Sequence, residues 1–170
     1  MTATENEGRT IFSHMPITIR PAFASDAPDI GRLAMEFAGY LRSLGDQSEL
    51  NLNAEAYLRD GFGQLPAFSG IVALESGRVI GYLLYHFGYD SDAAARNLHV
   101  ADLYVEREGR NRGAGTALMK AAAKIARDAG APEMIWSVYR ANGLAADFYQ
   151  NLGAQRITDV FFMKLGADAL

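Results

Sequence analysis

The sequence predicts an α/β domain in which a central mixed β-sheet is flanked by helices. Two apolar runs joined by Ser76-Gly77 have the character of a β-hairpin. The second half of the chain then alternates strand, helix, strand, helix and strand, which requires a crossover between parallel strands. Hairpin pairs and a crossover pair together make a sheet that is partly antiparallel and partly parallel.

The elements of the first half have separate local signals. Ile17-Thr18-Ile19-Arg20 alternates apolar and polar residues, as a half-buried strand does. Asn53 is placed to cap a short helix, which Asp60-Gly61-Phe62-Gly63 ends. The expected order is a strand at 17–20, a helix from a cap at Ser25 or Asp26 to Gly45, a helix after Asn53, strands at 71–74 and 79–87, and a strand at 98–105.

The second half continues with a helix whose apolar positions recur at helical spacing from about Gly113 to Gly130. Three more elements follow it, namely a strand at 134–138, a short helix at 144–152 and a last strand at 160–165. The chain has 170 residues, of which 49% are hydrophobic, so one domain with a real core is expected. Residues 1–15 are expected to be a mobile leader and residues 16–170 a single domain.

Composition excludes several classes of protein. The net charge of −4 argues against nucleic-acid binding, and the absence of cysteine excludes disulfides, thiolate metal sites and a cysteine nucleophile. The three histidines form no ligand cluster, so no metal is predicted. No apolar run is long enough to span a membrane, and the leader has no hydrophobic signal region. We expect a cytoplasmic protein.

Asp102 is the most informative acid of the predicted strands. On a regular strand it shares a face with Leu98, Val100 and Tyr104, while His99 points to the opposite face. A buried acid without a partner is costly, so Asp102 should have one. Two partners are open: a ligand, or a structural hydrogen bond to a neighbouring loop.

The turn Arg110-Asn111-Arg112-Gly113-Ala114-Gly115 connects this strand to a helix and predicts an anion site. Free backbone N–H groups and the positive end of the helix dipole meet there, and the glycines let a phosphate approach the main chain. A P-loop is excluded because Thr116 follows Gly115 without a lysine, and a dinucleotide fingerprint because Leu118 occupies the place of its third small residue. In a chain of negative charge, clustered arginines favour a local phosphate site over a nucleic-acid surface.

The spacing Arg-x-x-Gly-x-Gly resembles the signature of the GNAT superfamily of N-acetyltransferases. Asn142, Phe148-Tyr149 and Leu152-Gly153-Ala154 look like the C-terminal motif of that family. A closer resemblance, to diamine (spermidine/spermine) and thialysine N-acetyltransferases, rests on four further segments. These are Asp60-Gly61-Phe62-Gly63 before Pro66, Val79-Ile80-Gly81-Tyr82, Tyr85-His86-Phe87-Gly88-Tyr89-Asp90 and Asp102-Leu103-Tyr104-Val105.

The resemblance implies a GNAT sandwich whose sheet is splayed at the strand Leu98–Val105, acetyl-CoA as cosubstrate, no metal, and a homodimer by analogy. Tyr149 matches the family's general acid, although a core tyrosine beside Phe148 is the plainer interpretation. Asn142 matches a cofactor contact and also suits a helix cap. The expected cofactor-binding residues are Leu103, Tyr104, Val105, Arg110, Asn111, Arg112, Gly113, Ala114, Gly115, Thr116 and Asn142, and the expected acceptor-binding residues are Asp102, Asp90, Glu36 and Tyr40.

The acceptor side departs from the polyamine-type pattern. Ala101 stands where those relatives carry a Glu, Leu41 follows Tyr40 where they tend to have another, and Ala141 replaces a Trp. The missing carboxylates weaken the case for a long polycation and leave the general base open. The alternatives are a water relay, direct uptake of neutral amine, and His99, which is expected on the face opposite Asp102. The expected function is acetyl transfer to a primary amine of a small molecule, a diamine, polyamine or amino-acid-like compound. Alternatives are a catalytically weak acyl-CoA-binding or regulatory module, and a protein or peptide N-acetyltransferase.

Overall fold

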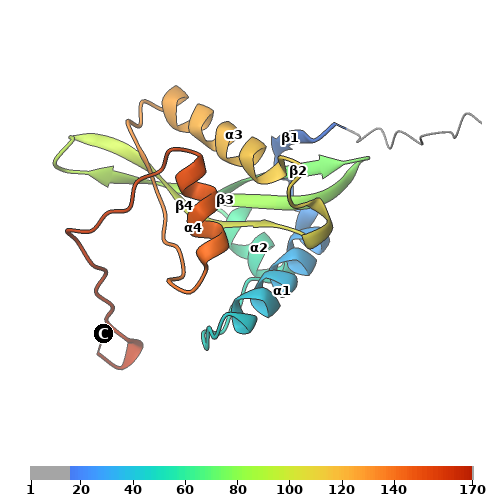
Figure 1. Cartoon of the computed structure of the whole chain (residues 1–170), viewed down its shortest axis with the longest axis horizontal. Coiled ribbons are helices and arrows are strands. Elements are labelled where there is room, and N and C mark those ends of the chain that lie inside the picture. Colours follow the sequence, from blue (N-terminus) through green and yellow to red (C-terminus); the bar gives the residue numbers. More distant parts are fainter. Residues whose placement is uncertain (1–15, 170) are drawn as a thin grey trace, which may run out of the picture. The chain divides into compact units, whose positions relative to one another are not determined.

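The computed structural model describes residues 16–169, which divide between two compact units that meet in the sequence at Trp136 and Ser137 (Figure 1). The expected leader at residues 1–15 lies outside the described residues. The first unit contains the sheet and three helices, and the second contains one further helix. Each unit is described by itself.

The sheet of the first unit has five strands in the order β1-β2-β3-β4-β5. The first three pairings are antiparallel, and β4 pairs with β5 in parallel, so the sheet is mixed as the sequence predicts. The strands are β1 Thr18–Pro21, β2 Ser69–Glu75, β3 Arg78–Asp90, β4 Ala95–Val105 and β5 Met134–Ile135. The expected strand at 134–138 is therefore wrong in length, because the pairing with β4 ends at Ile135.

Helices cover both faces of this sheet. The helices α1 (Ala27–Ser43) and α2 (Ala54–Gly61) lie below it in Figure 1, and α3 (Ala114–Asp128) crosses above it. Contacts agree, since α3 contacts β2, β3 and β4 while α1 contacts β3 and β4. A buried cluster on the α1 side joins residues of both helices to the sheet, and its largest fully buried side chains are Tyr57, Tyr82, Ile30, Leu33 and Val72.

Local signals formed the expected boundaries. The side chain of Asn53 accepts a hydrogen bond from the amide of Ala56 at 2.9 Å and so caps α2. Ser76 and Gly77 both have positive φ, 52° and 79°, which is the backbone of a tight hairpin turn between β2 and β3. Short 3₁₀ turns at Ala24–Asp26 and Arg107–Gly109 precede α1 and follow β4.

A β-bulge at Ala101 changes which side chains of β4 share a face. Asp102 lies opposite Leu84, but the next residue of β3, Tyr85, lies opposite Val100, so Ala101 is an extra residue in β4. An extra residue reverses the alternation of side chains beyond it. The expectation for Asp102 was therefore wrong: it shares the face of Tyr104 and His99, while Leu98 and Val100 lie on the other face.

The second unit contains α4 (Gly143–Asn151) and a 3₁₀ turn at Ala167–Ala169. The expected strand at 160–165 is wrong, because no strand is formed there and its side chains are exposed. An apolar run carries β-propensity, but a strand also needs a neighbouring backbone to pair with. Within residues 16–169 no helix is long and apolar enough to cross a membrane.

Candidate active site

The edge of β4 that faces β5 is open over its second half. β5 pairs only with Leu98 and His99, and beyond that point no described strand lies along β4 on this side. The amide of Glu106 donates to the carbonyl of Ile80 at 2.9 Å, toward β3. Because hydrogen-bonded positions alternate along an antiparallel pair, the backbone groups of Leu103 and Val105 face the open edge. These are two of the residues expected to hold the cosubstrate.

The loop after β4 ends in an uncapped helix N-terminus. Gly113 is the N-cap residue of α3, with a φ of 87°. Because glycine has no side chain, it cannot cap the helix. The first helical bond runs from the amide of Ala117 to the carbonyl of Gly113 at 2.8 Å. The amides of Ala114, Gly115 and Thr116 precede it, so they point out of the helix end. A set of such amides with the helix dipole behind it suits a phosphate.

Arg110 has a structural role that sequence reasoning missed. Its Nε donates to the carbonyl of Val105 at 3.0 Å, and its guanidinium lies 4.8 Å from the ring centre of Tyr40 and 5.2 Å from that of Tyr104. Stacking on two aromatic rings and bonding the end of β4 fix the loop against α1. Tyr40, expected at the acceptor site, is thus one of the residues that hold the loop.

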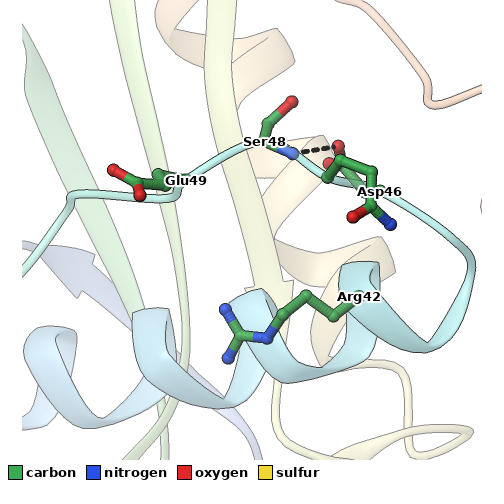
Figure 2. A pocket seen from close by; sticks show the side chains of 5 residues that line it. Arg42, Asp46, Ser48 and Glu49 are labelled. Atoms are coloured by element: carbon green, nitrogen blue, oxygen red, sulfur yellow. Dashed lines mark hydrogen bonds between the residues drawn. The ribbon is translucent and has the colours of Figure 1, made fainter.

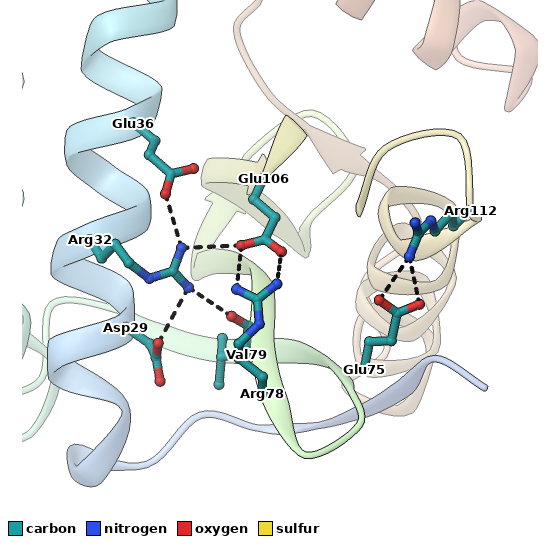
Figure 3. Close-up of polar contacts among 8 residues, drawn as sticks. All are labelled: Asp29, Arg32, Glu36, Glu75, Arg78, Val79, Glu106 and Arg112. Carbon is teal, nitrogen blue, oxygen red and sulfur yellow. Dashed lines mark hydrogen bonds and ion pairs between the residues drawn. The ribbon is translucent and has the colours of Figure 1, made fainter. Parts of the chain in front are cut away.

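The other arginines of the loop differ from Arg110. Arg112 forms an ion pair with Glu75 of β2, with Nη1 to carboxylate distances of 3.0 and 2.9 Å (Figure 3). Arg107 is exposed on the 3₁₀ turn, and Asn111 takes the left-handed conformation with a φ of 60°. The contacts of Asn111 and Arg112 with a phosphate stay predictions.

A buried carboxylate, Glu106, holds the end of β4 in place. It accepts hydrogen bonds from Arg78 of β3 and, at 3.1 Å, from Arg32 of α1, which also donates to the carbonyl of Val79 at 2.9 Å (Figure 3). Burial alone would raise the pKa of Glu106, but the bonds and charges of Arg78 and Arg32 outweigh it and lower the pKa. No sequence pattern predicts this network, because Arg32, Arg78 and Glu106 are far apart in the chain.

Asp102 has a side-chain partner of its own. The hydroxyl of Tyr82 donates to Oδ2 of Asp102 at 2.6 Å, across the β3–β4 pair. Burial raises the pKa of Asp102 to about 6, although the bond from Tyr82 and the amide of Leu103 act in the opposite direction. Burial and the charge of Asp102 raise the pKa of Tyr82 well above its ordinary value. Asp102 is therefore an ionised, hydrogen-bonded carboxylate at neutral pH.

The remaining acceptor candidates are already engaged. Glu36 accepts from Arg32 at 2.9 Å, one turn along the exposed side of α1 (Figure 3). Asp90 accepts from the amides of Asp92 and Ala93 at 2.8 and 3.1 Å, which shapes the turn between β3 and β4. Arg110 contacts both Tyr40 and Tyr104, and Asp102 shares a sheet face with Tyr104. Glu36 and Asp90 instead have local partners.

Two hollows in the surface do not coincide with these residues. One follows α1 and is lined by Arg42, Asp46, Gln47, Ser48 and Glu49, with the amide of Ser48 bonded to Asp46 at 2.9 Å (Figure 2). The other lies where α2 meets β1, β2 and β3, and its aromatic lining consists of Tyr57, Phe62, Phe68 and Tyr85. Neither lining includes Asp102 or the start of α3.

The predicted residues of the second unit sit on α4. Asn142 caps this helix, since its Oδ1 accepts from the amide of Ala145 at 3.1 Å. The rings of Phe148 and Tyr149 are neighbours, with centroids 5.0 Å apart. The cap is confirmed, whereas the cofactor contact of Asn142 and the acid role of Tyr149 stay predictions. Among the described residues no group of three or more potential metal ligands gathers.

The open edge of β4 and the bare start of α3 are the parts that the resemblance assigns to an acyl-CoA-dependent transferase. Residues 33–154 match the family model described as "Acetyltransferase (GNAT) family". The chain belongs to this family and is an N-acetyltransferase. The predicted fold class and the resemblance to the diamine and thialysine group are both confirmed.

Individual relatives agree with the family match. The chain is 36% identical over 151 residues to thialysine N-epsilon-acetyltransferase of Bos taurus, covering 84% of this chain and 86% of that protein. It is 32% identical over 143 residues to spermidine/spermine N(1)-acetyltransferase-like protein 1 of Homo sapiens, covering 80% of this chain and 20% of that one. An integron cassette protein from the mobile metagenome of V. cholerae shares the fold, with a TM-score of 0.76 at 23% identity over 91% of this chain and 95% of that chain.

Proposed function

We propose that the protein transfers an acetyl group from acetyl-CoA to the primary amine of a small molecule, a diamine or an amino-acid-like compound. The observation that carries the proposal is the open edge of β4 ending beside the uncapped start of α3. The acceptor class is supported by a relative named for thialysine that aligns over 84% of this chain.

The residues of this edge fit the cosubstrate. The amides of Ala114, Gly115 and Thr116 would hold the pyrophosphate, and the backbone of Leu103 and Val105 would bond the amides of the pantetheine arm. A side chain at Gly113 would be strained, because its φ of 87° is left-handed. When bound, acetyl-CoA supplies an acetyl group activated as a thioester.

The acceptor ammonium would be held by Asp102. This carboxylate lies on the sheet face that bears Tyr104 and is ionised above a pH of about 6. The hydroxyl of Tyr82 donates to Oδ2 and the amide of Leu103 also bonds this carboxylate. A carboxylate has about four acceptor positions, so it can still accept from an amine. Tyr40, Glu36 and Asp90 are proposed as secondary acceptor contacts. One strong carboxylate favours a short amine over a long polycation.

Tyr149 is proposed as the general acid that protonates the leaving thiolate. A thiolate is a better leaving group when a hydroxyl donates to it in the transition state. Asn142, which caps α4, is also proposed to bond the cosubstrate. We further propose that the protein acts in the cytoplasm as a homodimer, which light scattering of the purified chain would test.

The test is release of CoA from acetyl-CoA across a panel of amines, followed with a thiol reagent. The chain has no cysteine, so its own background reaction is near zero. The panel includes short diamines, spermidine, thialysine, lysine, aromatic amines and a lysine peptide. Turnover with short amines, above that with spermidine or the peptide, supports the proposal. Turnover with the peptide alone would favour a protein acetyltransferase, and acetyl-CoA binding without any turnover would favour a binding module.

A further inference from the structure

A histidine pair lies on the same sheet face as Asp102. His86 of β3 and His99 of β4 are directly opposite each other, and their ring centroids are 4.7 Å apart. Tyr82, Leu84 and His86 share one face of β3 by alternation, and Tyr82 and Leu84 belong to the core cluster on the α1 side. His99 therefore faces the α1 side, together with Asp102 and Tyr104.

The bulge at Ala101 is what produces this arrangement. Without the extra residue, His99 and Asp102, three positions apart, would lie on opposite faces. With it, the two side chains lie on one face, opposite His86 and Leu84 of β3, which are two residues or about 7 Å apart at a rise of roughly 3.3 Å per residue. One or two water molecules bridge such a distance. Ala101 itself is exposed and carries no ionisable group.

Amine acetylation needs a proton acceptor on this face. An alkyl ammonium has a pKa of about 10.4, so at neutral pH it must lose a proton before it can attack. Asp102 is bonded to Tyr82 at 2.6 Å and is better suited to hold the ammonium. Burial raises the pKa of both Tyr82 and Tyr104, which makes them poor acceptors. Two further ionisable sites remain among the described residues of this face on β3 and β4, namely Asp90 and the histidine pair. Asp90 accepts from two amides of the β3–β4 turn, and the histidine pair lies nearer to Asp102.

His99 has an atom that fits the task. Its Nδ1 is buried and has no hydrogen-bond partner among the described residues. Such a nitrogen is satisfied at lowest cost by water or by a ligand atom. Burial first, and then the charge of His86, lower the pKa of His99, so its ring is neutral at pH 7.

We propose that His99, whose ring lies against that of His86, is the proton acceptor for the incoming ammonium. It would take the place of the carboxylate that is absent at Ala101. The lone pair of the neutral ring takes one proton from R–NH₃⁺ through water and leaves R–NH₂. The amine nitrogen then bonds to the acetyl carbon as the C–S bond breaks and its electron pair leaves with sulfur. The imidazolium returns its proton to solvent. This inference rests on the proposed function and adds a role that the sequence left open.

Among the described residues, the ionisable groups on the face of His99 are His86, Tyr82 and Asp90 on β3 and Asp102 and Tyr104 on β4. Asp90 lies at the far end of β3 and accepts from the amides of Asp92 and Ala93. The β5 neighbours of His99, Met134 and Ile135, do not ionise. Glu36 of α1 lies near Tyr104 and raises the pKa of that residue. A pH profile therefore has two candidate acidic limbs, from His99 and from Asp102.

The test is the pH dependence of kcat and KM for the best amine in the native protein, His99→Gln and Arg96→Gln. Arg96 is exposed in the same strand and serves as the matched control. We expect His99→Gln to lower kcat about 100-fold at pH 7 with little change in the KM of the amine, and the deficit to shrink toward pH 9.5 as free amine becomes abundant. Added imidazole should restore part of the rate in His99→Ala, and Arg96→Gln should behave as the native protein.

A measurement on the native protein covers the case in which the variants do not fold. The pKa of His99 read by NMR should lie below 6.5 and coincide with an acidic limb of kcat/KM. A native-like pH profile of kcat/KM in folded His99→Gln would overturn the inference while leaving the proposed function intact. Loss of the acidic limb in Asp102→Asn, with the limb unchanged in His99→Gln, would do the same. No turnover by the native protein on any amine would instead count against the proposed function.

Discussion

The two sides of β4 offer different kinds of chemical group. The open edge offers the backbone amides and carbonyls of Leu103, Val105 and the start of α3, which we propose bind the cosubstrate. The α1 face offers side chains, namely Asp102 with Tyr82 and His99 with His86, which we propose serve the acceptor. Backbone groups depend on glycines and chain direction, whereas side-chain groups depend on register. A family can thus keep the first set fixed while the second varies between acceptors.

The largest effect should come from Tyr149, because this residue is proposed to act in the chemical step and not in the binding of acetyl-CoA. Tyr149→Phe removes only the hydroxyl, so we expect kcat to fall about 100-fold or more while the dissociation constant of acetyl-CoA changes less than about 2-fold. Steady-state kinetics and calorimetry measure the two quantities. Phe148→Tyr provides a neighbouring control on α4. An unchanged kcat in Tyr149→Phe would remove the acid role.

The next effect concerns the acceptor alone. Asp102→Asn keeps the shape of the side chain and an oxygen for the Tyr82 hydroxyl but removes the charge. Loss of a charged hydrogen bond costs about 1.5–3 kcal/mol, so the KM of the amine should rise roughly 10- to 100-fold. The affinity for acetyl-CoA should stay as it was, because the open edge uses backbone groups. A fall in both affinities would show that the two sides are not independent.

Asp102 also makes stability depend on pH. Its pKa rises from an ordinary 3.8 to about 6 on folding, so the folded state binds more protons than the unfolded state between these values. The free energy of unfolding should therefore fall as pH rises from 4 to 6 and carry the full cost above 6.

Asp102→Asn should flatten this dependence. At pH 7 the free energy of unfolding of the variant should exceed that of the native chain by up to about 1–2 kcal/mol, a value reduced for partial solvent access. Urea unfolding at pH 4, 5, 6 and 7 measures it, with exposed Asp92→Asn as the control. A parallel pH dependence in Asp102→Asn and the native chain would contradict the raised pKa.

The smallest effect tests the backbone side. Gly113 and Gly130 both have positive φ, 87° and 72°, and a Cβ at either would meet open space. Alanine should cost about 1 kcal/mol of stability at each position. Only Gly113→Ala should also weaken acetyl-CoA binding, by about 5-fold, because Gly113 precedes the amides of Ala114, Gly115 and Thr116 that are proposed to hold the pyrophosphate. Equal acetyl-CoA affinity in the two variants would argue against a pyrophosphate site at α3.

The sequence by itself determined the mixed α/β fold, the hairpin at Ser76-Gly77, the caps Asn53 and Asn142, and the family. These features depend on local propensity, glycine conformations and motif spacing, all of which are carried by neighbouring residues. It also predicted that a helix begins at about Gly113, which depends on the backbone alone, whereas the cosubstrate contacts of Leu103 and Val105 stay predictions.

Only the tertiary structure decided which side chains of β4 share a face with Asp102, the residue proposed to hold the acceptor. Alanine carries no signal of a bulge, yet the extra residue at Ala101 moved His99 onto the face of Asp102. Tyr82, Glu106 and Arg110 found partners far away in the chain, and the apolar run at 160–165 found no strand to pair with. Register and long-range pairing are properties of two segments at once, and no single stretch of sequence contains them.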